Sequence, residues 1–386
     1  MKMFEYMARS AGLLFLAILL PGERDAHAEW LDVMPHHVWE FPGDHWANED
    51  YRVEWWYFTG FLERDSESGE DESSNGRMPA YAYQFTFFRI GLATDSLPGA
   101  SHWRSRNLIM GHASLIDLAR SEHRFSEAIY RDAPLLTHVG RYPDSVLVRS
   151  RAPAGTDGVW TLSWNGAGFD VAMTDDAGEI AFALRTTPAR ALVFQGPAGY
   201  SVKGPTNASL YYSFPRLDTE GTLTWSGRSI PVRGTSWMDR ELSSGHLSEG
   251  QTGWDWFSLR MNDGTDMMLY ALRDSAGAPG HKAGTWIEGD APPRYLGDAW
   301  TANVKRTWKS GASGIEYPVA WEIRVPDRGL VLEVEALFPE QENRTRIPGG
   351  INYWEGAVRV RDESGKERGI GFVEMTGYGE GNRPPL

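Results

Sequence analysis

Hydrophobic and polar positions along this chain follow the periodicity of β-strands. Short runs of alternating or continuous β-formers recur, and turn-forming residues separate them, which is typical of antiparallel sandwiches and barrels. The sequence has no long apolar helical stretch, no sustained heptads and no βαβ alternation. It therefore predicts an all-β fold. Strands are expected over residues 51–62, 80–90, 145–148, 160–164, 180–184, 222–225, 254–261, 266–273, 320–325, 330–337 and 369–375.

Two parts of the chain carry similar paired runs. A Trp-rich run at 54–62 is followed, after the acidic loop at 63–76, by a second run that ends in Arg89. Near the middle, a Trp-rich run at 253–259 leads through Asp263-Gly264 to a run that ends in Arg273. The simplest interpretation is two related β-domains in tandem, 29–215 and 216–386, with the boundary near Pro215. Chance similarity between aromatic strands is the alternative.

The N-terminus predicts export. Residues 11–20 are apolar but too few to span a bilayer, which needs about 20 residues. Ala26-His27-Ala28 then matches the small-residue pattern that signal peptidase cuts. We expect residues 1–28 to be a signal peptide, cleaved after Ala28, and the mature chain to be periplasmic or secreted. A retained N-terminal anchor is the alternative.

Composition narrows the function. The net charge of −14 argues against binding nucleic acid or anionic headgroups, because both reward clustered Lys and Arg. The chain has no cysteine, so disulfides, thiolate nucleophiles and Cys-ligated zinc are excluded. Its 17 Trp, 16 Phe and 15 Tyr suit pleated surfaces and an aromatic pocket. Transient contact with a membrane or a transporter stays open, as does the oligomeric state.

Carboxylates embedded in aromatic strands are the best candidates for chemistry. The sequence has no G-x-S-x-G, H-E-x-x-H or P-loop motif, and neither a metal nor an organic cofactor is expected. In an extended strand Trp237, Asp239 and Glu241 share one face, because successive side chains alternate. By the same rule Glu54 aligns with Trp56, and Asp255 aligns with Phe257 rather than with its neighbouring tryptophans.

Such a carboxyl group suits acid catalysis. Beside indole rings it is poorly solvated, so its pKa rises and it can keep its proton near neutral pH. Aromatic faces also attract developing positive charge, by about 0.5 to 2 kcal/mol per contact. This combination fits protonation of an alkene followed by capture of water, with Asp239 as the first candidate acid. The alternative is that the carboxylates pair with Arg89, Arg240 or Arg273 and hold strands in register.

Several aromatic motifs follow one another in order along the chain. They are Glu54-Trp55-Trp56-Tyr57, Tyr83-Gln84-Phe85-Thr86-Phe87-Phe88-Arg89, Gly199-Tyr200-Ser201-Val202-Lys203-Gly204, Tyr211-Tyr212-Ser213, Trp237-Met238-Asp239-Arg240-Glu241, Gly253-Trp254-Asp255-Trp256-Phe257, Tyr353-Trp354-Glu355-Gly356-Ala357 and Val373-Glu374-Met375-Thr376-Gly377-Tyr378. Together they resemble the AttH-like branch of the carotenoid 1,2-hydratase (hydroxyneurosporene synthase) family, from about Val53 to Tyr378.

The resemblance implies two lipocalin-like antiparallel β-barrel domains and a pocket for an apolar ligand. In hydratase members of that family, water is added across the terminal double bond of an acyclic carotenoid, with an aspartate suggested as proton donor. Around Asp239 the family more often has His and Trp where this chain has Arg240 and Leu242. An adjacent Arg would favour the ionised aspartate. Export also makes a carotenoid substrate unexpected, since carotenoid synthesis occurs at the cytoplasmic membrane.

Three functions stay open at this point. The first is an exported lipocalin-like protein that binds an isoprenoid, acyl or polyketide-like ligand, and the second is a hydratase or hydrolase acting on such a ligand. The third is a sugar-binding β-domain. The candidate catalytic residues are Asp239, Glu241, Glu54 and Asp255. The candidate ligand-binding residues are Trp56, Tyr57, Gln84, Tyr200, Lys203, Tyr212, Trp237, Trp254 and Trp256.

Overall fold

The computed structural model describes residues 30–65, 78–94, 105–205, 207–243, 245, 247–347 and 350–384. The expected signal peptide and most of the expected acidic loop lie outside these residues. The described chain is almost entirely β, and each strand expected from the sequence lies on a strand of the structure. No helix among the described residues has the length and apolar character needed to cross a bilayer.

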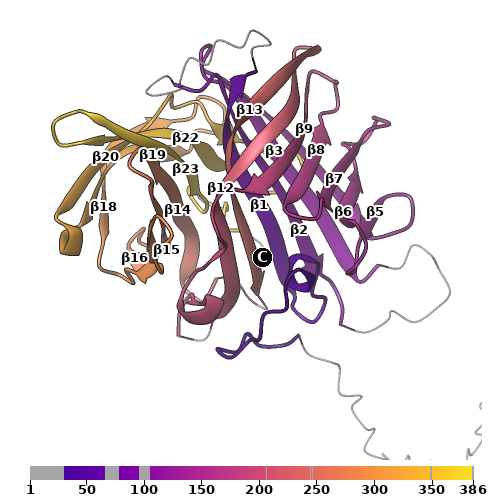
Figure 1. Ribbon diagram of the computed structural model, residues 1–386, viewed down its shortest axis with the longest axis horizontal. Helices are drawn as coiled ribbons and strands as arrows, with labels where there is room; N and C mark the ends of the chain where they lie inside the picture. The colour runs from indigo at the N-terminus through magenta and orange to yellow at the C-terminus, as the bar shows by residue number, and fades with distance from the viewer. Residues whose placement is uncertain are drawn as a thin grey trace, which may run out of the picture.

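The first sheet has thirteen strands among the described residues and curls back on itself (Figure 1). Its order is β4-β3-β2-β1-β13-β12-β9-β8-β7-β6-β5, with β10 and β11 pairing with β12. At the curl Tyr130 Oη donates to Ala152 O at 2.7 Å, which joins β4 to the end of β6. The strands are β1 (Val53–Arg64), β2 (Tyr81–Gly91), β3 (Asn107–Asp117), β4 (Glu122–Arg131), β5 (Thr137–Val139), β6 (Val146–Arg151), β7 (Val159–Trp164), β8 (Phe169–Thr174), β9 (Ile180–Pro188), β10 (Val193–Phe194), β11 (Tyr200–Val202), β12 (Ala208–Trp225) and β13 (Arg228–Ser243).

The second sheet has ten strands within the described part of the chain, in the order β17-β16-β15-β14-β23-β22-β20-β19-β18, with β21 beside β22. In both sheets the first strand in the chain lies between the second and the last, so the two similar paired runs occupy the same place. The strands are β14 (Gln251–Met261), β15 (Thr265–Asp274), β16 (Pro279–Glu288), β17 (Arg294–Tyr295), β18 (Thr301–Lys309), β19 (Glu316–Val325), β20 (Leu330–Ala336), β21 (Glu342–Asn343), β22 (Tyr353–Asp362) and β23 (Glu367–Met375).

The sheets divide later in the chain than the boundary expected at Pro215. Strand β12 is continuous through Pro215 and pairs with β13 on both sides of it. The first sheet ends at Ser243 and the second begins at Gln251. The pairing of β12 with β13 thus keeps residues 216–243 in the first sheet. Pro215 lies at the irregularity in register between Phe214 and Leu217.

Burial explains why some strands are continuously apolar and others alternate. Strand β2 is buried along nearly all of its length, whereas β8 alternates between buried and half-buried positions. A strand covered on both faces needs apolar residues at every position, while a strand that faces water needs them at every second one. Separate apolar cores fill the interiors of the two sheets, and a third core lies between the sheets.

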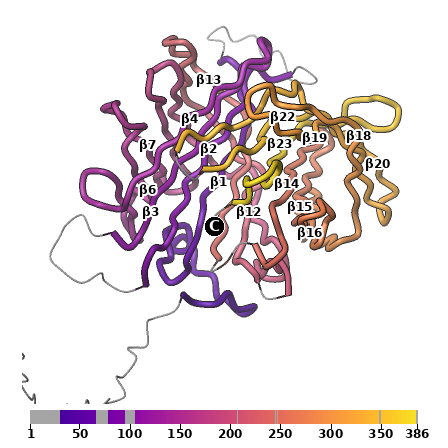
Figure 2. Tube along the Cα trace, turned by 180° about the vertical axis from the view of Figure 1, so that it is seen from behind, coloured from indigo at the N-terminus to yellow at the C-terminus, as the bar shows by residue number. Residues whose placement is uncertain are grey.

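The two sheets lie side by side, with β14 next to β1 and β12 in both views (Figures 1 and 2). Ion pairs to one buried carboxylate also join them. Asp266 on β15 accepts hydrogen bonds from Arg190, which follows β9, and from Arg216 Nε at 3.0 and 3.1 Å. Ion pairs as well as apolar packing therefore hold the two sheets together.

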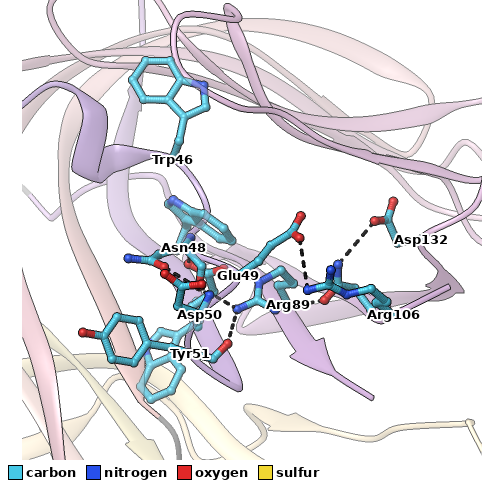
Figure 3. Close-up of polar contacts among 12 residues, drawn as sticks. Trp46, Asn48, Glu49, Asp50, Tyr51, Arg89, Arg106 and Asp132 are labelled. Carbon is cyan, nitrogen blue, oxygen red and sulfur yellow. Dashed lines mark hydrogen bonds and ion pairs between the residues drawn. The ribbon is translucent and has the colours of Figure 1, made fainter. Parts of the chain in front are cut away.

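The segment before β1 packs against the end of the first sheet. It contains η1 (Gly43–His45), the first of three 3-10 helices among the described residues, with η2 (Pro197–Gly199) and η3 (Pro326–Arg328). Arg89 on β2 donates to the backbone oxygens of Asn48 at 3.0 Å and Tyr51 at 2.6 Å (Figure 3). A single buried guanidinium thus holds the entry to β1.

Candidate active site between the two sheets

A pocket lies between the facing outer sides of the two sheets, and we call it the intersheet pocket. Its cavity has a volume of about 90 Å³. Eight aromatic residues line it: Trp55, Tyr57, Phe88, Tyr211, Trp254, Trp256, Tyr270 and Tyr353. Four carboxyl groups line it as well: Asp239, Glu241, Glu355 and Glu374. Lys203 is the only basic side chain among the lining residues that the structure describes.

Strand alternation selects which residues reach this pocket. On β13, Asp239 and Glu241 face the pocket, whereas Met238 belongs to the interior core of the first sheet. Trp237 joins the core between the sheets, on the same side as Asp239. The expectation that Trp237, Asp239 and Glu241 share one face is therefore confirmed.

Asp239 is held by three hydrogen-bond donors. Its Oδ2 accepts from Tyr211 Oη at 2.7 Å, and its Oδ1 accepts from Trp237 Nε1 at 2.7 Å and from Ser213 Oγ. Burial raises the pKa of Asp239 to about 7, the three donors oppose this rise, and the charge of Glu241 adds to it. The group can therefore exchange a proton near neutral pH.

Glu241 forms an ion pair with Lys203, at 2.8 Å between Oε1 and Nζ. The ammonium lies 4.0 Å from the ring centroid of Tyr270 and 5.0 Å from that of Tyr211. Burial would lower the pKa of Lys203, but Glu241 and Tyr270 hold it above its usual value. Lys203 is thus charged and already paired with Glu241.

Glu355 and Glu374 lie directly opposite each other on β22 and β23. Burial raises the pKa of Glu374 to about 8, and the charges of Asp239 and Glu241 contribute, although the Trp254 indole opposes the rise. Burial and the neighbouring Glu374 also raise the pKa of Glu355 well above its usual value. Both carboxyl groups accordingly favour the protonated form at neutral pH.

A neutral histidine supports this wall of the pocket. His112 Nδ1 lies 2.8 Å from the hydroxyl of Tyr353, so a residue of the first sheet contacts one of the second. Burial lowers the pKa of His112 to about 3, which keeps the ring uncharged. Among the described residues, no group of three or more His, Asp or Glu side chains is arranged to hold a metal ion.

Glu54 does not reach the pocket. It faces the interior of the first sheet, where it accepts hydrogen bonds from Arg89 and Arg240, and all three side chains are fully buried. Burial alone would raise the pKa of Glu54, but the two guanidinium groups hold it below its usual value. Glu54 and Asp239 therefore do not share an acid pocket, because their side chains lie on opposite faces of the first sheet.

Asp255 also lies outside the intersheet pocket. Its Oδ1 accepts from Arg273 Nε at 3.0 Å and from Tyr378 Oη at 3.1 Å. It alternates with Trp254 and Trp256, which line the pocket, as the strand pattern predicted. Pairing with arginine, the alternative weighed from the sequence, describes both Glu54 and Asp255.

The candidate ligand-binding residues divide between the two faces. Tyr57, Lys203, Trp254 and Trp256 line the pocket, and Trp237 donates to Asp239 beside it. Gln84 donates from Nε2 to Oγ1 of the lining residue Thr86 at 2.5 Å. Trp56 and Tyr212 instead contact His45 inside the first sheet, and Tyr200 is not a lining residue.

Sequence reasoning missed part of the site. Tyr211 and Ser213 donate to Asp239 and alternate along β12, so the period of two could have identified them. Glu355 follows Tyr353-Trp354, which is the same carboxyl-among-aromatics pattern that selected Asp239. Glu374 lies in the apolar run Phe372-Val373 and gave a weaker signal.

Two curled antiparallel sheets with an acidic, aromatic pocket define a lipocalin-like protein. A family model described as AttH-like matches residues 32–378, so the chain belongs to the AttH-like family. The structure of an AttH-type protein, NE1406 of Nitrosomonas europaea, superposes with a TM-score of 0.76 at 29% identity, covering 90% of this chain and 100% of that one.

Three further relatives have lower identity to this chain. Kievitone hydratase of Fusarium solani subsp. phaseoli is 22% identical over 232 residues, which cover 57% of this chain and 63% of that protein. The dehydratase asqC of Emericella nidulans is 22% identical over 193 residues, which cover 47% of this chain and 54% of that protein. The chain thus matches somewhat over half the length of these relatives. Kievitone hydratase of Nectria haematococca shares the fold, with a TM-score of 0.61 at 15% identity over 88% of this chain and 92% of that one.

Proposed function

We propose that this chain binds an apolar, unsaturated small molecule in the intersheet pocket and adds water to it or removes water from it. One observation carries the proposal. Asp239, Glu355 and Glu374 meet among aromatic rings, and burial raises the pKa of each carboxyl group. Acid–base catalysis works best when the catalytic pKa lies near the working pH.

The reaction uses these groups in two steps. A carboxylic acid gives its proton to one carbon of a double bond, and the π electrons form the new C–H bond. The neighbouring carbon becomes cationic, and the aromatic faces stabilise it by about 0.5 to 2 kcal/mol per contact. Water then forms the C–O bond and loses its proton to a carboxylate. Dehydration runs through the same steps in reverse.

The names of the relatives support this class of reaction, since one is a hydratase and another a dehydratase. Binding of an apolar ligand without turnover is the second candidate, because eight aromatic residues line the pocket. Export from the cytoplasm remains part of the proposal and depends on the expected signal peptide alone.

The test is turnover in H2¹⁸O. Purified protein is incubated with prenylated phenols, acyclic isoprenoid alkenes and alcohols, and β-hydroxyacyl esters, and mass spectrometry follows gain of labelled water or loss of water. A lipid extract of the protein is analysed in parallel for a bound ligand.

We expect at least one of these classes to react. The double variant Asp239→Asn/Glu374→Gln should abolish turnover, while Glu333→Gln, an exposed position on β20, should not affect it. Unchanged turnover in the double variant would assign the chemistry to another site. If the parent protein binds a ligand but does not convert it, the second candidate function, binding alone, is supported and the reaction is refuted. If the parent protein shows neither binding nor turnover, the whole proposal is overturned.

A further inference from the structure

We propose that Glu374, paired with Glu355 across β22 and β23, is the general acid of the intersheet pocket, and that Asp239 is the base. This inference rests on the proposed function and assigns its two proton-transfer roles. It reverses the assignment that the sequence favoured, in which Asp239 was the first candidate acid.

The surroundings of Asp239 suit a carboxylate. A carboxylate has about four acceptor positions, and Tyr211, Ser213 and Trp237 fill three of them. The indole N–H can only donate, and donors to the ionised form favour that form. One acceptor position remains, which is what a base needs to receive a proton from an attacking water molecule.

The surroundings of Glu374 suit a carboxylic acid. Glu355 is its direct cross-strand partner and is only 1% exposed, and two like charges so close together do not ionise together. The basic side chain that lines the pocket, Lys203, is engaged by Glu241. Glu374 keeps part of its surface open to the pocket whereas Glu355 is buried, so Glu374 is the member of the pair that can touch a ligand.

The charges around Glu374 agree with this assignment. Among the described residues, the titratable groups that line the pocket with Glu374 come from both sheets and from the segment after β11: Glu355 and Tyr353 on β22, Tyr270 on β15, Tyr57 on β1, Tyr211 on β12, Asp239 and Glu241 on β13, and Lys203 after β11. Burial raises the pKa of Glu374 to about 8 and that of Asp239 to about 7. Three hydrogen-bond donors oppose the rise at Asp239 and one, from Trp254, opposes it at Glu374, so we expect Asp239 to lose its proton first as the pH rises.

The two roles lie on different sheets, so a ligand between the sheets has the acid on one wall and the base on the other. Glu374 transfers its proton to carbon, water attacks the cationic carbon, and Asp239 takes the proton that this water releases. After the product leaves, water in the pocket carries that proton back to Glu374. The cycle consumes one water molecule and returns both carboxyl groups to their starting forms.

Infrared spectroscopy tests the assignment without a substrate. The C=O stretch of a protonated carboxylic acid is recorded at pH 7.5 for the parent protein and for Glu374→Gln, Glu355→Gln and Asp239→Asn. We expect Glu374→Gln and Glu355→Gln each to lose intensity in this band, because both carboxyl groups hold protons, and Asp239→Asn to retain most of the parent intensity. Loss of the band only in Asp239→Asn would overturn the assignment. Thermal melts check that each variant is folded.

The pH dependence of kcat/KM separates the roles once a substrate is known. Glu374→Gln should reduce kcat/KM by about 10²-fold or more, and its residual activity should rise with pH because Asp239 must be ionised. If Asp239 were the acid, the residual activity would instead fall as the pH rises. Glu355→Gln replaces a carboxyl group that is itself protonated, so it should change kcat less than Glu374→Gln and leave the alkaline limb near that of the parent.

The two proposals can fail separately. If Glu374 holds the proton but no compound reacts, the proposed function fails and the proton assignment stands. If turnover occurs but the infrared band follows Asp239, the function stands and the assignment is overturned.

Discussion

Replacing Glu54 with Gln should destabilise the protein strongly, although Glu54 lies outside the intersheet pocket. Its carboxylate accepts hydrogen bonds from Arg89, Arg240 and the backbone N–H of Asn48, the last at 3.1 Å. The side chains of Glu54, Arg89 and Arg240 are all 0% exposed. Glutamine keeps the shape but removes the charge, so two guanidinium groups stay buried without a counterion.

The expected loss follows from this geometry. Breaking a buried ion pair by removing one partner costs about 3–5 kcal/mol. For a unit of roughly 150–250 residues, each kcal/mol lowers Tm by about 2–4 °C, so the expected fall is about 6–20 °C. No cavity term adds to it, because Glu and Gln have nearly the same volume.

Tryptophan fluorescence recorded during thermal and urea unfolding measures this effect. Trp56 reports on the site, because the Arg240 guanidinium lies 4.0 Å from its ring centroid. The guanidinium groups hold the pKa of Glu54 below 4.5. Its contribution is therefore present above about pH 4.5 and lost as the pH falls through the folded-state pKa. The difference in free energy of unfolding between the parent and Glu54→Gln should be largest at pH 7 and should shrink in acid.

Glu374→Gln is the matched control. In the parent, the pKa of Glu374 rises from 4.5 to about 8 on folding. The contribution of Glu374 to stability is therefore present below pH 4.5 and is lost as the pH rises through 8. The Gln variant should match the parent in acid and exceed its stability at alkaline pH. Glu54→Gln should retain turnover well below its Tm, whereas Glu374→Gln should not. An unchanged Tm in Glu54→Gln, or equal losses in both variants, would refute the reasoning.

Three further changes have definite expected outcomes. Asp266→Asn should lower the free energy of unfolding by roughly 1.5–3 kcal/mol in urea titrations, because this buried carboxylate binds two partly exposed arginines, Arg190 after β9 and Arg216 on β12. Burial lowers the pKa of His112 from 6.5 to about 3, so the unfolded chain takes up the proton first and stability is lost as the pH falls between these values. His112→Gln should flatten that loss when urea midpoints at pH 7 and pH 4.5 are compared. Gly60→Ala should cost about 1–3 kcal/mol in thermal melts, because a Cβ there would lie 2.3 Å from a neighbouring tyrosine ring. Each expectation would be contradicted if its own measurement matched the parent: the urea titration for Asp266→Asn, the shift in urea midpoint between pH 7 and pH 4.5 for His112→Gln, and the thermal melt for Gly60→Ala.

Much of the fold could be predicted from the sequence, because the relevant signals are local. Alternation with a period of two placed strands correctly and put Asp239 and Glu241 on one face of β13. The family motifs extended this to the lipocalin-like class. The expected boundary at Pro215 was misplaced, since proline usually interrupts a strand but β12 absorbs it at an irregularity in register.

The site shows the limit of local reasoning. Any aromatic strand with a carboxylate looked similar in sequence, yet Glu54 and Asp255 neutralise arginines inside the sheets while Asp239 and Glu241 face the pocket. Which face meets solvent, a core or the other sheet is decided by packing between distant strands. The alternation itself does not carry that information.

The sequence by itself determined the β class, the alternation of side chains and the aromatic supply for a pocket, because each depends on neighbours along the strand. Only the tertiary structure decided that the pocket lies between the sheets rather than within one. It also brought Glu374 and Glu355 opposite each other and placed both across from Asp239. The pKa of a carboxyl group depends on the charges and water around it, and here those surroundings come from strands far apart in the chain.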